Sequence, residues 1–253
     1  MLFWVALRKE LLEQWRTYRA LVVAAVLLAF GLLSPLTAKL TPELIRLLPK
    51  GDQLAGLIPA PTALDAVAQY LKNMSQFAVI LALLLAMGAL TQEKERGTAA
   101  MLLSKPLPRW AFLAAKFAAL GLTFAVSLVL AGAGAYYYTW LLFGPLDLAA
   151  WAALNGLLLV FTLVYLALTL LCSVLAGSGS QAAAGGIAFG LLVLFTVLGA
   201  IPQVGQYLPG ELVNWAGRLF AGGASGWPAL AVSLGLIVAA LAAAWWRFEG
   251  QEL

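Results

Sequence analysis

Six long apolar segments are the feature of this 253-residue chain that most restricts its fold. They occupy residues 20–37, 74–91, 110–143, 151–176, 181–200 and 228–246. A bilayer core of about 30 Å is crossed by about 20 apolar residues in a helix, so all six are candidates for membrane spans. Inside lipid the backbone must satisfy its own hydrogen bonds, and the alternation of a membrane barrel is missing. We therefore predict an all-α polytopic membrane protein with six transmembrane helices, forming one transmembrane domain over residues 1–253.

The composition agrees with this class and narrows the chemistry. Hydrophobic residues make up 63% of the chain and charged residues 10%, whereas a soluble domain has about 25% charged residues. The sequence has no histidine, which removes the commonest general base and most metal sites. Its single cysteine, Cys172, lies in an apolar segment and permits no internal disulfide. We expect no catalytic residues, no cofactor or metal on this chain, and no nucleic-acid partner.

The distribution of lysine and arginine predicts the orientation. Ten of the 15 basic residues lie near the N-terminus, after the second apolar segment or at the C-terminus, and five lie on the opposite side. Cytoplasmic loops of membrane proteins carry the excess of positive charge. We therefore predict an inner (cytoplasmic) membrane protein with both termini and residues 93–109 in the cytoplasm, and residues 39–73 and 201–227 outside.

An amphipathic segment precedes the first apolar segment, at residues 2–19. Apolar and aromatic side chains recur at helical spacing, whereas the charged side chains fall largely on other faces. The stripe consists of Trp4, Leu7, Leu11, Trp15 and Tyr18. Such a helix is expected to lie at the membrane interface with its cations toward anionic lipid headgroups. The alternative is a cytosolic extension of the first span.

A second amphipathic segment begins at Pro209-Gly210 in the predicted outer loop, 201–227. Glu211, Asn214 and Arg218 share one helical face, and Leu212, Trp215 and Leu219 share another. This pattern predicts a short re-entrant helix that dips into the outer leaflet, and a plain surface loop is the alternative.

Residues 93–109, after the second apolar segment, are rich in charge and carry the signals of a short helix. Thr98 can cap a helix over 99–105, and Gly97 lets the chain turn into it. Pro106 stops the helix, and Leu102 and Leu103 give it an apolar face.

Charged side chains flank this predicted helix on both sides. They are Glu93, Glu95, Arg96, Lys105 and Arg109. An apolar helix with a charged rim is suited to docking into a groove on a partner, where rim charges tune orientation more than affinity. A solvated loop without a partner is the alternative.

The six spans, the amphipathic N-terminal segment and this loop resemble the membrane (permease) subunit of type-2 ABC transporters, in their compact six-span branch. In that family the loop after the second span typically reads Glu-x-x-x-Gly-Thr, then Leu-Leu-Ser-x-Pro, then Arg and Lys. The matching residues here are Glu93, Gly97, Thr98, Leu102, Leu103, Ser104, Pro106, Arg109 and Lys116, and Pro108 is a departure from the pattern.

The resemblance implies a function and a set of partners. The chain would form the substrate path of an exporter, driven by ATP and Mg²⁺ on two separate ABC ATPase subunits, together with a second permease copy or a homologue. The loop residues Glu93, Glu95, Arg96, Gly97, Thr98, Leu102, Leu103, Ser104, Pro106 and Arg109 would couple it to the ATPase. The chain itself has no Walker motif for ATP hydrolysis.

Two other classes of function remain open at this stage. One is an ion-coupled or passive membrane transporter without an ATPase partner, although ion coupling usually places ionisable residues deep in the spans, and these spans hold none there. The other is a structural or assembly membrane protein, or an intramembrane enzyme. The substrate, and the choice between homodimer and heterodimer, are left open by the sequence.

Overall fold

The computed structural model describes residues 2–47, 59–95, 108–176 and 180–250, and these ranges contain helices and no strand. In chain order the helices are α1 (Leu2–Arg16), α2 (Arg19–Arg46), α4 (Ala63–Glu95), α6 (Arg109–Phe143), α7 (Leu148–Leu175), α8 (Gln181–Gly199), α9 (Pro202–Gly205), α10 (Gly210–Arg218), the 3₁₀ helix η1 (Leu219–Ala221) and α11 (Trp227–Glu249).

Six of these helices are long and apolar enough to cross a membrane, which confirms the predicted fold class. They are α2, α4, α6, α7, α8 and α11. Helix α4 begins well before the apolar segment at residue 74, and the Asp65 carboxylate caps its start. The backbone N–H and the hydroxyl of Thr62 both donate to Asp65 Oδ2, at 2.7 and 2.8 Å.

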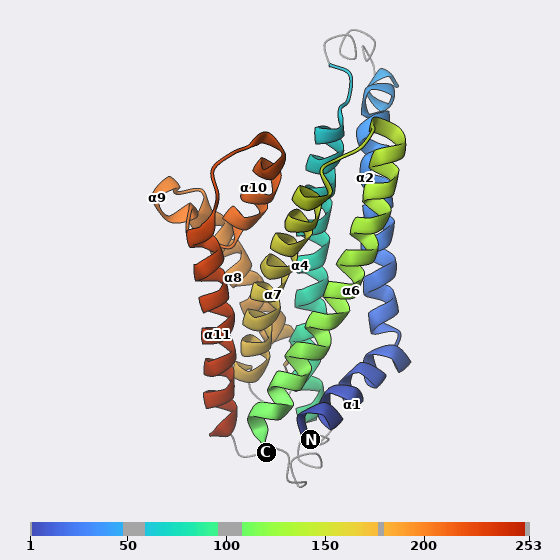
Figure 1. Cartoon of the computed structure of the whole chain (residues 1–253). Helices are drawn as coiled ribbons and strands as arrows, with labels where there is room; N and C mark the ends of the chain where they lie inside the picture. Colours follow the sequence, from blue (N-terminus) through green and yellow to red (C-terminus); the bar gives the residue numbers. More distant parts are fainter. Residues whose placement is uncertain (1, 48–58, 96–107, 177–179, 251–253) are drawn as a thin grey trace.

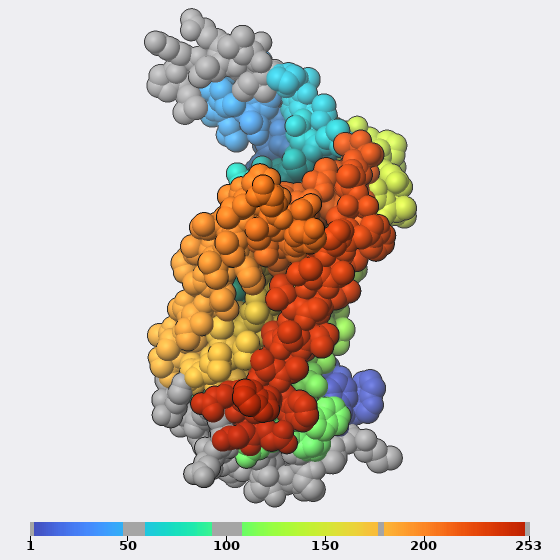
Figure 2. Space-filling model, turned by 90° about the vertical axis from the view of Figure 1, so that its left-hand side faces the viewer, coloured from blue at the N-terminus to red at the C-terminus, as the bar shows by residue number. Residues whose placement is uncertain are grey.

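Helix α7 occupies the centre of the bundle and contacts α4, α6, α8, α10 and α11. In Figure 1, α2, α4 and α6 pack on one side of α7, and α8 and α11 lie on the other. In the most apolar stretch of each helix, 78% of residues are buried in α7 but only 11% in α8 and 22% in α11. Figure 2 shows α8 and α11 on one face of the molecule, with part of α7 visible between them. These outer helices leave broad apolar faces to contact lipid or another protein.

Small residues allow the spans to approach closely, as is usual inside membranes. A Cβ at Gly31 of α2 would lie 2.8 Å from the Ala131 carbonyl oxygen of α6. A Cβ at Gly132 would lie 2.7 Å from Asn155 Oδ1 of α7. Larger side chains at either position would force these helices apart.

The predicted N-terminal helix is present, but it is shorter than the predicted segment 2–19. Helix α1 ends at Arg16, and Tyr18 adopts a left-handed backbone conformation with φ of 59°. The chain therefore turns sharply between α1 and α2 (Figure 1). The prediction that Tyr18 continues the apolar stripe is wrong, because this residue lies beyond the end of the helix.

The second predicted amphipathic helix is confirmed as α10, with its two faces as expected. Arg218 and Asn214 both bond to the Glu211 carboxylate on the polar face. Leu212 and Trp215 on the apolar face are buried, and α10 packs mainly on α7. The apolar face therefore contacts protein, and entry of this helix into the outer leaflet stays a prediction.

Candidate functional site: the helix ends around residues 96–107

The predicted coupling residues lie where α4 ends and α6 begins, which we call the loop end of the bundle. Arg96, Gly97, Thr98, Leu102, Leu103, Ser104 and Pro106 lie outside the described residues, as does the predicted helix over 99–105. Glu93 and Glu95 belong to the last turn of α4, and only their backbone is described. Arg109 is the first residue of α6. Figure 1 shows that α1 and the last turn of α11 also lie at this end.

On the α4 side, Gln92 connects three helices through one amide group. Its Oε1 accepts a hydrogen bond of 2.9 Å from Arg19 Nη2, at the first residue of α2. Its Nε2 donates to Gln181 Oε1, at the first residue of α8, over 3.1 Å. The amide oxygen of Gln92 therefore bonds to α2, and its amide nitrogen bonds to α8.

One turn earlier, Ser173 of α7 contacts the backbone of α4. Its hydroxyl donates to the Met87 carbonyl at 3.0 Å and accepts from the Leu90 N–H at 3.2 Å. The last turns of α4 are thus held by polar contacts from α2, α7 and α8.

On the α6 side, Arg109 holds the end of α11. Its Nη1 donates to the carbonyl oxygens of Phe248 and Glu249, both at 2.7 Å, and its guanidinium lies 5.7 Å from the centre of the Phe248 ring. The last carbonyls of a helix lack intrahelical donors and carry partial negative charge. The Arg109 guanidinium therefore supplies both the missing hydrogen-bond donors and a positive charge beside these carbonyl oxygens. Arg109 was predicted to belong to a rim facing a partner, but its described contacts lie within the chain.

Two turns further along α6, Lys116 forms a buried ion pair with α1. Its Nζ lies 3.1 Å from both carboxylate oxygens of Glu10, and Lys116 and Glu10 are 3% and 7% exposed. Thr123 of α6 adds a second contact by donating to Gln14 Oε1 at 2.6 Å. Glu10 and Gln14 are one turn apart, so one polar face of α1 packs along α6.

The other faces of α1 match the predicted amphipathic character. Trp4 and Trp15 are 69% and 71% exposed, on the side of the helix away from Glu10. Lys9 Nζ lies 3.0 Å from Glu13 Oε2 on the charged face. Burial of the Glu13 carboxyl raises its pKa, but the hydrogen bond and charge of Lys9, with the charges of Lys116 and Arg19, outweigh this and hold the pKa below its usual value.

The sequence analysis missed the buried face of α1 and the role of Gln92. Glu10 and Gln14 lie one helical turn apart, which is a local signal for a shared face. No nearby residue indicates that this face contacts protein instead of water or lipid headgroups. Its partner Lys116 is 106 residues from Glu10 in the chain.

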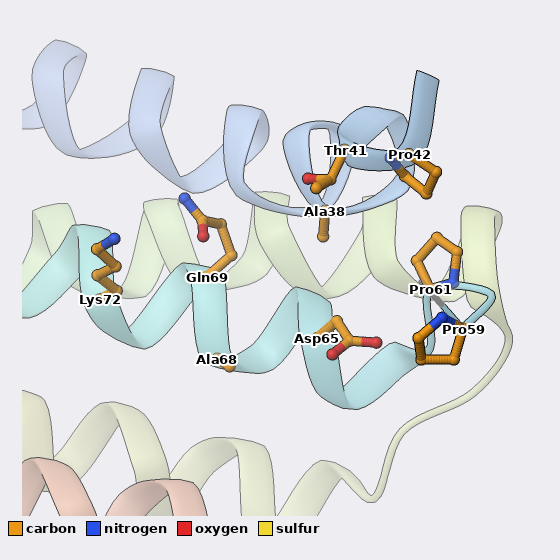
Figure 3. Close-up of a pocket in the computed structure, with 9 residues that line it drawn as sticks. All are labelled: Ala38, Thr41, Pro42, Pro59, Pro61, Asp65, Ala68, Gln69 and Lys72. Carbon is orange, nitrogen blue, oxygen red and sulfur yellow. The ribbon is translucent and has the colours of Figure 1, made fainter. Parts of the chain in front are cut away.

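A hollow of about 340 Å³ lies at the opposite end of the bundle, between α2 and α4. Figure 3 shows its lining, with Ala38, Thr41 and Pro42 from α2 facing residues of α4 and the segment before it. Asp65 is the carboxylate of the lining, and it is engaged by Thr62. The hollow is therefore a weaker candidate for the functional site than the loop end.

Within the described residues, no three His, Cys, Asp or Glu side chains are grouped so that they could hold a metal ion. The polar contacts of the loop end connect helices to one another. In the part of the chain that the structure describes, these contacts suit the transmission of force or the setting of helix position, and none of them pairs a nucleophile with a base.

Comparison with known proteins identifies relatives over nearly the whole chain. Residues 4–253 match the model of a family described as ABC-2 family transporter protein. A relative in Bacillus subtilis (strain 168), the uncharacterized transmembrane protein YxlG, is 26% identical over 253 residues, which cover 97% of this chain and 96% of the relative.

Proposed function

Because the chain belongs to the ABC-2 family of transporter proteins, we propose that it is the permease subunit of an ABC exporter driven by ATP hydrolysis on separate ATPase subunits. The family match over residues 4–253 is the observation that carries this proposal. The six candidate spans give the chain the form of a multi-pass membrane protein. Family membership implies an ABC ATPase as partner in general, and the proposal assigns the coupling to residues 93–109.

The contacts around this segment support its assignment as the coupling element. The helix before it is held by α2, α7 and α8, and the helix after it is held by α1 and α11. A displacement of residues 93–109 by an ATPase would therefore act on helices throughout the bundle. Alternating access in transporters uses such movements of one group of helices against another.

The remaining partners are proposed from the surface and the family. Two ATPase copies with bound ATP and Mg²⁺ would serve two permease chains, this one and a second copy or homologue. The exposed apolar faces of α8 and α11 provide surface for that second chain and for lipid. Export as the direction of transport is proposed from the family resemblance.

The alternative of an ion-coupled transporter gains no support from the described spans. The buried charged side chains among the described residues are Glu10 and Lys116, and they pair with each other near the loop end. A path for protons or cations usually places ionisable residues deeper in the bundle.

Binding of the ATPase tests the proposed function. The chain is expressed with the ABC ATPase encoded nearest to it, purified in detergent, and assayed for co-purification and for phosphate release. We expect hydrolysis by the complex and none by the chain alone. Leu103→Asp should abolish binding, because a charged carboxylate loses its hydration in an apolar groove, at a cost of about 2–7 kcal/mol for a polar group alone and more for a charge.

Leu47→Asp is the matched control, since Leu47 is 82% exposed and follows the end of α2 that lies away from the loop end. This variant should insert, bind and hydrolyse like the parent. ATP hydrolysis by the pure chain, or full binding by Leu103→Asp, would contradict the proposal.

A further inference from the structure

The end of α4 is joined to the start of α8 by a side-chain bridge between Gln92 and Gln181. We propose that Gln92 is a positioning residue that makes α8 move together with α4 when residues 93–109 are displaced. This inference rests on the proposed function, because the displacement is attributed to an ATPase.

The bridge is specific in its hydrogen bonding. Gln92 Oε1 accepts from Arg19, which leaves Nε2 to donate to Gln181 Oε1 at 3.1 Å. An amide has both a donor and an acceptor, so glutamine suits this position in a way that glutamate or lysine does not. The orientation of the Gln92 amide is therefore set by Arg19, which has only donors to offer.

The backbone around the bridge leaves room for it. A Cβ at Gly88, one turn before Gln92, would lie 3.0 Å from Gln92 Nε2 and 3.2 Å from Gln181 Nε2. A side chain at position 88 would crowd the ends of both amides, which would have to shift by a few tenths of an ångström.

Helix α8 buries little of its surface within the chain. In its most apolar stretch 11% of residues are buried, and among the described helices it contacts α7, α4, α9 and α10. The Gln92–Gln181 bond is therefore well placed to decide whether the loop end of α8 follows α4 or stays with α7.

The experiment measures the distance between α4 and α8 directly. Spin labels are attached to cysteines at Leu84 and Ala183, both exposed, in a chain in which Cys172 is replaced by alanine. The labelled chain is assembled with its ATPase and measured without nucleotide and with Mg²⁺ and a non-hydrolysable ATP analogue. We expect one narrow distance in the parent that the nucleotide leaves unchanged.

Gln92→Leu removes both halves of the bridge, because leucine can neither accept from Arg19 nor donate to Gln181. The analogue should therefore broaden and lengthen the α4–α8 distance while ATPase binding persists. Gln181→Glu keeps the acceptor and should behave like the parent. Gln76→Leu, at an exposed position of α4, is the matched control.

The outcomes separate this inference from the proposed function. If the ATPase does not bind the parent chain, the proposed function fails. If it binds and hydrolyses ATP but Gln92→Leu keeps the parent's distance with the analogue, the positioning role of Gln92 is overturned. A nucleotide-dependent change of this distance in the parent would overturn it as well, because α4 and α8 would then not move together.

Discussion

The two helices that flank residues 96–107 are held by different chemistry. Among the described side chains, the end of α4 is held by neutral groups, the amides of Gln92 and Gln181 and the hydroxyl of Ser173, with Arg19 as the one charged partner. The start of α6 is held by a buried ion pair and a guanidinium on helix carbonyls. Neutral hydrogen bonds contribute about 0.5–1.5 kcal/mol, whereas removal of one partner from a buried ion pair costs about 3–5 kcal/mol.

This difference suggests a division of roles at the loop end. Bonds between neutral groups can be exchanged at low cost as helices shift, so the α4 side is suited to movement. A buried charge that loses its partner is costly, so the α6 side is suited to keep α1, α6 and α11 together. Substitutions on the two sides should therefore differ in their effect on stability.

The largest loss of stability is expected for Lys116→Met. Glu10 would keep its bond of 2.9 Å to the partly exposed Lys9 but lose the buried ammonium group. We expect the loss to lie near the lower end of the range for broken buried pairs, about 3 kcal/mol. Thermal unfolding in detergent measures it, with the exposed Lys72→Met as the matched control.

The double variant Glu10→Gln/Lys116→Met sharpens this result. Removing the carboxylate charge as well leaves no unpaired charge from this pair, so most of the lost stability should return. A single variant as stable as the parent would show that the α6 side is not held by charge.

A smaller and more local effect is expected for Arg109→Ala. The last carbonyls of α11 would lose two charge-assisted hydrogen bonds and the contact with the Phe248 ring, and we expect a cost of about 1.5 kcal/mol because the site is partly exposed. Hydrogen exchange should become faster for the amides of the last turn of α11 and stay unchanged in α8. Unchanged exchange in that turn would mean that Arg109 does not stabilise the end of α11.

A still smaller effect on stability is expected for Gln92→Leu. The bonds lost are partly buried and largely neutral, so the cost should be about 1 kcal/mol or less. Its unfolding curve is compared with that of Lys116→Met under the same conditions. Equal losses for the two variants would remove the contrast between the α4 side and the α6 side.

Those parts of the fold that depend on local patterns could be predicted from the sequence. Hydropathy located the six spans, and helical periodicity located α1 and the two faces of α10, because both signals arise from residues close together in the chain. The end of α1 was misplaced, since the left-handed conformation of Tyr18 follows from the sharp turn into α2 and not from a residue type that favours it.

The contacts of the loop end could not be predicted in the same way. Gln92 and Gln181 are 89 residues apart, and Arg109 and Phe248 are 139 apart. Hydropathy and periodicity say which residues face inward or outward on one helix, but not which helix lies opposite. Arg109 was assigned to a partner from its place in the loop, and α11 supplies its described contacts. The assignments of all ten coupling residues stay predictions.

The smallest effect is expected on the exposed side of α1, at Glu13, where pH separates surface charge from the buried pair. The folded chain holds the pKa of Glu13 below its ordinary value of 4.5. Its carboxylate therefore stabilises the folded chain at pH values above that ordinary value, and this contribution is lost as the pH falls through the folded pKa. The side chain is 38% exposed, so solvent screens the charge, and an ion pair between residues i and i+4 on a helix contributes about 0.3–0.5 kcal/mol. Glu13→Gln should thus be slightly less stable than the parent at pH 7, and the difference should shrink in high salt and as the pH falls through the folded pKa. Unfolding of both chains over a pH series from 7 to below 4.5 measures it. A difference that acid leaves unchanged would show that Glu13 acts through packing, and a loss as large as that of Lys116→Met would show that the charged face of α1, like its buried face, holds α1 against α6.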